Sequence, residues 1–129
     1  MGQAVTLSAD STITGMGISY VSGSCDVRMA LYEDASGSPG ALVAETGASA
    51  LSVGDNELAL SGSDVPVAAG TYWLLKVHDV TCVLTEASGP QATSTVYRTL
   101  SYTSSFPDPG GSFSSYNDHE MAIWLIGYE

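Results

Sequence analysis

Cys25 and Cys82 are the only thiols of the sequence, and together they could form one disulfide. Two thiols are too few for a zinc site built from cysteines. The sulfurs come into the same neighbourhood if the strand that begins at Cys25 runs antiparallel to the strand that ends before Cys82. Met29 and Trp73 are both expected to point inward. Cys25 shares the face of Met29, but strict alternation puts Cys82 on the face opposite Trp73. A bulge or turn near residues 79–81 would therefore have to reset the register before the two sulfurs could meet. A disulfide and two buried free thiols both stay open.

Oxygen-bearing side chains suggest a calcium site, because Ca²⁺ prefers carboxylate and amide oxygens. One group lies in or beside a long loop of the last third and consists of Asp108, Asn117, Asp118 and Glu120. A second, smaller group is Asp55, Asn56 and Glu57. Neither has the spacing of an EF-hand loop, and the alternative is that dispersed acids keep the surface soluble. Calcium is the one cofactor that the sequence suggests.

Aromatic side chains crowd the last third of the chain and could stack on sugar rings beside hydrogen-bonding polar groups. The candidates for ligand or partner contact are Tyr97, Tyr102, Tyr116, Trp124 and Tyr128. Trp124 and Tyr128 are the best of these, because they share the second face of the last expected strand. The alternative is that each ring packs in the core or at a subunit interface.

Signatures of catalysis are incomplete. The pair His119–Glu120 begins like a zinc-protease motif but lacks the second histidine, and Gly15-Met16-Gly17 lacks the third glycine of a dinucleotide loop. Only His78 and His119 could serve as an imidazole base. We therefore expect a protein that is not an enzyme, with a hydrolytic enzyme as the third and weakest alternative.

The charge of the chain argues against one class of partner. Its 129 residues include 14 acidic and 3 basic side chains, which gives a formal net charge of −11. Such a surface repels phosphate backbones and anionic lipids, so we expect neither nucleic-acid binding nor membrane attachment. With 44% hydrophobic residues the chain can nevertheless build a packed core.

Alternating apolar residues predict strands along the whole chain. The clearest lie at 3–7, 16–20, 25–32, 71–78 and 120–128, and weaker ones at 41–45, 57–60, 80–85 and 93–102. We expect the 25–32 strand to bury one face, and Trp73, Leu75 and Val77 to point inward from the 71–78 strand. Glycine and proline predict a chain reversal at 34–40 and a long loop at 104–117.

These elements predict an all-β fold. About eight or nine short strands, frequent turn signals and no capped helical pattern favour a single antiparallel, jelly-roll-like β-sandwich over residues 1–129.

Two segments also resemble a broad group of β-sandwich modules. Val27 to Val43 contains a strand ending in Tyr32 and a Gly-x-Pro-Gly turn, and Ala69 to Leu74 contains an Ala-Gly-x-Tyr-Trp strand. Modules with this pattern occur in bacterial extracellular proteins and in phage tail or other virion proteins. The resemblance implies a non-catalytic domain for adhesion, carbohydrate binding or particle assembly, and it carries over no ligand residues.

We therefore expect an extracellular or virion-borne binding module that recognises carbohydrate or a cell surface. The alternative is a structural subunit of an assembly, such as a phage decoration, tail or filament protein. In that case the last strand and the 104–117 loop would contact neighbouring subunits, and a homo-oligomer would be one form of such an assembly.

Overall fold

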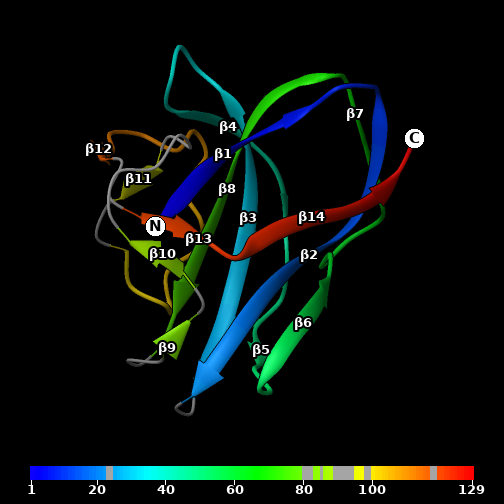
Figure 1. The fold of residues 1–129 in the computed structure, drawn as a ribbon. Coiled ribbons are helices and arrows are strands. Elements are labelled where there is room, and N and C mark those ends of the chain that lie inside the picture. The colour runs from blue at the N-terminus through cyan, green and yellow to red at the C-terminus, as the bar shows by residue number, and fades with distance from the viewer. Residues whose placement is uncertain (23–24, 80–82, 85, 89–94, 98–99, 117–118) are drawn as a thin grey trace.

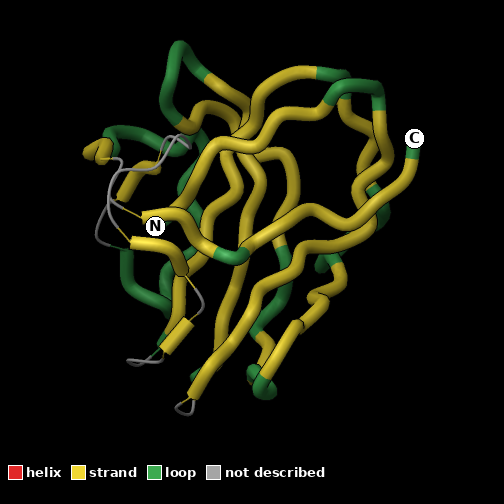
Figure 2. The backbone as a smooth tube through the Cα atoms, in the orientation of Figure 1, coloured by secondary structure: helices red, strands yellow, loops and turns green. Residues whose placement is uncertain are grey.

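The structure is a computed structural model of residues 1–129. It describes the chain except for residues 23–24, 80–82, 85, 89–94, 98–99 and 117–118. Strands and loops make up the described chain, with no helix among these residues (Figure 2), and thus none that could cross a membrane.

The strands form two large antiparallel sheets and one small one (Figure 1). Sheet A has seven strands: β1 (Gly2–Leu7), β3 (Asp26–Asp34), β4 (Pro39–Glu45), β5 (Ser49–Ala50), β8 (Gly70–His78), β11 (Thr95–Tyr97) and β12 (Ser114–Tyr116). Sheet B has five: β2 (Ser11–Ser22), β6 (Gly54–Ala59), β7 (Val65–Val67), β9 (Val83–Leu84) and β14 (Ile123–Tyr128). The third sheet pairs β10 (Glu86–Ser88) with β13 (His119–Met121).

The order of strands is β12-β11-β1-β8-β3-β4 in sheet A, with β5 beside β3, and β14-β2-β6 in sheet B, with β7 and β9 beside β2. The chain crosses between the sheets repeatedly, as from β1 to β2 and from β7 to β8. The antiparallel β-sandwich predicted from the sequence is confirmed. Its strands outnumber the eight or nine predicted, because several pieces of two or three residues pair with the long strands β2 and β3.

The main core lies between the two sheets. Ile13, Met16 and Ile18 of β2 face alternate residues of β3 (Val27, Met29, Leu31), and all are buried. The spacing of three between Ile13 and Met16 reflects an irregularity of β2, where the pairing with β14 skips Thr14. At one side Gln3 closes this core, because its amide donates to the carbonyl of Met121 at 3.0 Å and accepts from the same residue's N–H at 2.8 Å. This buried side chain thus pairs with β13 as a strand backbone would.

A second core covers the outer face of sheet A and corrects two expectations. Ala30 and Tyr32 of β3 are fully buried on the face opposite Met29, so β3 buries both faces and not one. Trp73 and Leu75 belong to this second core together with Phe106, and Val77 packs against it, so all three strand residues point outward from the sandwich and not inward as expected. Alternation alone could not reveal this, because the cover is the irregular segment 100–113, which forms no strand although the sequence predicted one as far as residue 102.

The predicted reversal at 34–40 is a tight hairpin between β3 and β4. The N–H of Ala35 donates to the carbonyl of Ser38 at 2.8 Å. Ser36 and Gly37, between them, have φ values of 57° and 90°. Two consecutive positive φ angles define a type I′ turn, whose twist matches that of the flanking strands.

The last predicted strand, 120–128, is divided in the structure. It forms β13 and β14 on either side of Ala122, whose carbonyl accepts from the N–H of Ser19 at 3.0 Å. The predicted loop at 104–117 is irregular up to β12.

Candidate functional site

The outer face of sheet B is a three-stranded surface whose register is fixed by pairing on both sides of β2. Three rows of outward-facing residues cross it from β14 through β2 to β6, given by the pairings Ala122–Ser19–Asp55, Trp124–Gly17–Glu57 and Ile126–Gly15–Ala59. We call these nine residues the B face. Unlike the outer face of sheet A, it carries no covering segment among the described residues (Figure 1).

Trp124 dominates the centre of the B face. Its indole lies directly over Gly17, where a Cβ atom would collide with the ring. The tryptophan is half-buried, whereas Gly17 beneath it is buried. Glycine at two of the three outward positions of β2, Gly15 and Gly17, therefore leaves the hollow in which a large ring rests on the sheet.

Two carboxylates border the tryptophan. Glu57 ends the same row, and Asp55 lies one row away on the same strand, both exposed. Ser19 is half-buried and lies between Asp55 and Ala122 in its row. A flat ring flanked by acceptor oxygens suits a ligand with an apolar face and hydroxyl groups at its edge, which describes a sugar ring.

A shallow hollow adjoins β14 near its end. It measures about 200 Å³ and is lined by Leu7, Ser11, Ile13, Leu125, Gly127, Tyr128 and Glu129. Tyr128 is 61% exposed at its rim. Of the two preferred contact candidates, Trp124 therefore lies on the B face, and Tyr128 is the last residue of the same strand.

The other aromatic candidates are not gathered at this site. Tyr97 is 47% exposed but stands on β11 of sheet A. Tyr102 lies in the segment that covers sheet A, where its ring packs beside the guanidinium of Arg28 at 5.2 Å. The side chain of Tyr116 lies outside the described residues.

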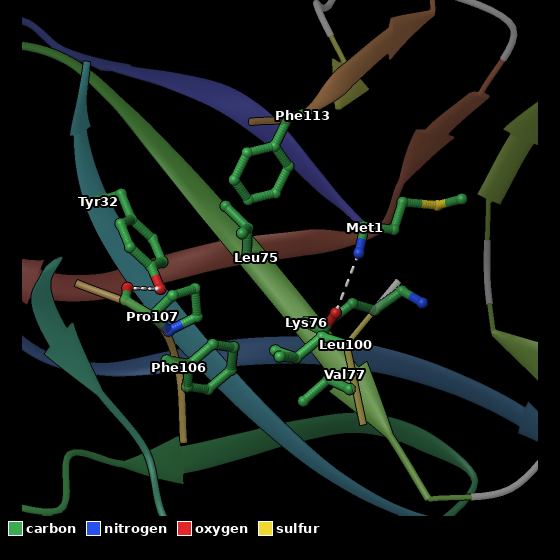
Figure 3. Close-up of a pocket in the computed structure, with 9 residues that line it drawn as sticks. All are labelled: Met1, Tyr32, Leu75, Lys76, Val77, Leu100, Phe106, Pro107 and Phe113. Carbon is green, nitrogen blue, oxygen red and sulfur yellow. Dashed lines mark hydrogen bonds between the residues drawn. The ribbon is translucent and has the colours of Figure 1, made fainter. Parts of the chain in front are cut away.

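Arg28 anchors that covering segment. Its guanidinium donates to the carbonyl of Tyr102 and, at 2.6 Å, to that of Ser104, and it lies 4.9 Å from the ring of Phe106. The hydroxyl of Tyr32 donates to the carbonyl of Pro107 at 2.7 Å (Figure 3). Sequence reasoning missed Arg28, although it is one of only three basic residues and lies within a strand.

A small cavity remains under the segment. It measures about 40 Å³, and its lining is mostly apolar: Met1, Tyr32, Leu75, Lys76, Val77, Leu100, Phe106, Pro107 and Phe113 (Figure 3). This volume holds a few water molecules at most and is far below the several hundred Å³ of a ligand pocket. We interpret the covering segment as a structural part of the fold.

The predicted calcium ligands are only partly described. A carboxylate oxygen of Asp108 accepts from the N–H of Leu42 at 3.0 Å, which ties the covering segment to β4. Asn117, Asp118 and the side chain of Glu120 lie outside the described residues. Within the described part of the chain no three acidic, histidine or cysteine side chains gather as a metal site would require. In the second acidic group, Asn56 instead fastens a turn by accepting from the N–H of Ser52 at 2.8 Å.

Cys25 is buried directly before β3, and the described part of the chain contains no free cysteine. Cys82 lies outside the described residues, so the disulfide stays a prediction. The sequence raised one objection to the disulfide, namely that alternation places the two cysteines on opposite faces. The structure removes it, because Met29 pairs with Lys76 on the inner face of the sandwich, while Trp73 points outward. The face of Lys76 is thus the face of Met29, and alternation does not separate the cysteines as the sequence suggested.

His78 is the one described imidazole side chain. Its Nδ1 is buried and finds no hydrogen-bond partner among the described residues. Burial lowers the pKa of His78 below its usual 6.5, the positive charge of Lys76 lowers this pKa further, and Asp79 opposes both. The side chain of the other histidine, His119, lies outside the described residues, and no catalytic role is derived for either.

Comparisons with known proteins add no assignment. No family model, curated protein or solved structure matches this chain. The β-sandwich is therefore established by the structure itself, while the likeness to extracellular and phage modules stays a prediction.

Proposed function

We propose that this chain is a non-catalytic binding module that recognises carbohydrate, on a cell surface or elsewhere, through the B face. The observation that carries the proposal is the indole of Trp124 lying half-exposed over Gly17 with Glu57 at the end of the same row. Large flat rings with nearby acceptors are the usual means by which a small protein holds a neutral sugar.

The charge pattern supports a neutral ligand. Asp55 and Glu57 leave the B face acidic within a chain of net charge −11, so anionic polymers are disfavoured as ligands. Nucleic acids and anionic membranes accordingly stay outside the proposal. An extracellular or virion-surface location, as the sequence resemblance implies, would expose the B face to glycans.

A glycan array followed by calorimetric titration of the strongest glycan tests the proposal. Trp124→Ala should weaken binding about 30-fold or more, since loss of a central aromatic contact typically costs at least about 2 kcal/mol. Glu57→Gln, which keeps the shape of the side chain, should weaken it less. Tyr97→Ala is the matched control, because it removes an exposed ring from the other sheet and should leave affinity unchanged.

Two results would contradict the proposal. One is an array without any signal above background for the folded wild-type protein. The other is a titration in which Trp124→Ala and Tyr97→Ala bind equally well, since the sugar would then lie elsewhere.

A structural subunit of an assembly is the second candidate function, and a hydrolytic enzyme is a distant third. One observation favours the second: β14 is the edge strand of sheet B and carries no charged residue from Ile123 to Tyr128. Exposed apolar edges of this kind invite pairing with another chain.

A further inference from the structure

The edge of sheet B formed by β14 lacks the protection that two other edges of the sandwich, at β4 and β6, carry. In the part of the chain that the structure describes, β14 pairs with β2 alone. Soluble proteins protect such edges with charges, prolines or a covering segment, because open N–H and C=O groups template the addition of a further strand.

The edges at β4 and β6 carry such protection. At β4, the N–H of Leu42 donates to Asp108 at 3.0 Å and the carbonyl of Gly40 accepts from the N–H of Gly110 at 2.7 Å. The covering segment therefore occupies that edge. The β6 edge carries the charged side chains of Asp55 and Glu57. From Ile123 to Tyr128, β14 contains no charge and no proline, and no described segment bonds to its outer side.

The backbone groups that are open on β14 follow from its pairing. Ala122 bonds to Ser19 opposite it, and opposite residues in an antiparallel pair alternate between bonded and non-bonded. Ala122, Trp124 and Ile126 thus direct their backbone groups toward β2. Ile123 and Leu125 direct theirs to the open edge.

We propose that this edge pairs with the same edge of a second copy, antiparallel about Leu125, so that two B sheets join into one. In this register Leu125 lies opposite its counterpart, and the two residues exchange both backbone hydrogen bonds. On the outer face Trp124 lies opposite Ile126 of the second copy, an aromatic and β-branched pair of the kind that stabilises sheets. Tyr128 lies opposite Ala122, so the edge is complementary to itself, as a two-fold interface requires.

The packing beside the edge suits the same occupant. Leu125 is half-buried and lines the hollow between β1 and β14 with Leu7 and Ile13. Antiparallel partners project to the same side of a sheet, so the Leu125 side chain of the second copy covers this apolar lining. No like charges oppose each other within the paired segment, although each copy brings a net charge of −11. Dimerisation should therefore strengthen as salt screens the repulsion between the copies.

Light scattering and sedimentation over a dilution series at low and high salt test the mass of the full chain. We expect twice the chain mass at high concentration, with tighter association at high salt. Ile126→Glu should weaken association roughly tenfold or more, because it brings a charge to the paired edge. Ala59→Glu is the matched control, since it lies in the same row of the B face on the opposite edge strand and should leave association unchanged.

Amide exchange followed by NMR locates the contact independently of any variant. The N–H groups of Ile123 and Leu125 should exchange more slowly as protein concentration rises. That of Glu57, which by the same alternation points away from β2 at the other edge, should not change. A monomer at every concentration and salt level overturns the proposal. So does a dimer that leaves the Ile123 and Leu125 amides unprotected and tolerates Ile126→Glu, because its interface would lie elsewhere.

Discussion

Tyr32 and Pro107 are joined by a hydrogen bond of 2.7 Å from the phenol hydroxyl to the backbone carbonyl, across 75 positions of sequence. The bond holds the irregular 100–113 segment against the outer face of sheet A, beside the cavity shown in Figure 3. The tyrosine that makes it is completely buried near the end of β3. The covering segment is thus fastened by a side chain whose own position the sheet determines.

Removing this hydroxyl should destabilise the fold. Tyr32→Phe keeps the ring but leaves the carbonyl of Pro107 without its donor, and we expect the free energy of unfolding in urea to fall by about 1 kcal/mol. Tyr128→Phe is the control, because Tyr128 is 61% exposed and the loss of its hydroxyl should change stability little. Equal stability of the Tyr32→Phe variant and the wild type would show that the hydrogen bond does not hold the segment.

Gly17→Ala should disturb the B face. The new Cβ would collide with the indole of Trp124, so the ring must move and the free energy of unfolding should fall by about 1–3 kcal/mol. Because the ring moves, the tryptophan fluorescence spectrum should also change. Gly62→Ala tests the specificity of this effect, since no atom lies within 4 Å of a Cβ at that position. An unchanged spectrum for Gly17→Ala would place the indole elsewhere.

His78 should make the fold less stable in acid. Its pKa is lowered in the folded protein, chiefly by burial, so the unfolded chain binds a proton more readily as pH falls through 6.5. Above pH 6.5 His78 is neutral in both states and does not lower the free energy of unfolding. This free energy then falls progressively as the pH drops from 6.5 toward the folded-state pKa. His78→Gln should flatten the dependence of melting temperature on pH in this window. The same slope in both proteins would assign the acid sensitivity to other groups.

The predicted disulfide between Cys25 and Cys82 should appear in the mass of the unreduced protein. A bond removes two hydrogen atoms, and reduction restores them. In the chain-entropy model a loop of this length stabilises the folded state by about 4 kcal/mol, so the reductant should also lower the melting temperature. Two thiols that react with alkylating reagent in the unreduced, denatured chain would refute the bond.

The sandwich was predictable because its signals are local. Alternation in residues 25–32 and 71–78 defines β3 and β8, and Gly37 marks the hairpin between β3 and β4. The orientation of Trp73 was not predictable in the same way, because alternation reveals two faces but not which of them meets the other sheet. The cover over Trp73 depends on Arg28 and Tyr32 reaching residues more than 70 positions away, and no local pattern encodes such contacts.

Only part of the candidate site could be predicted from the sequence. The second apolar face of residues 120–128 singled out Trp124 and Tyr128. In the sequence alone, the glycines at 15 and 17 resemble a fragment of a dinucleotide-binding loop, yet their spacing of two in a strand is the signal for a flat surface on which a ring can rest. Trp124 and Glu57 lie in one row because of the register of β14, β2 and β6. This register depends on tertiary pairing, so their proximity could not be predicted from the sequence.

The segment that covers sheet A makes the two outer faces of the sandwich different. Because the described chain covers one outer face and leaves the other open, the two sides of this sandwich are not interchangeable. A module attached through the covered side of sheet A would turn the B face outward, whereas one attached through the B face would expose the covering segment instead. Tethering the chain through Ser38, in the hairpin beside the cover, or through Ala59, on the B face, would produce two surfaces with opposite binding behaviour.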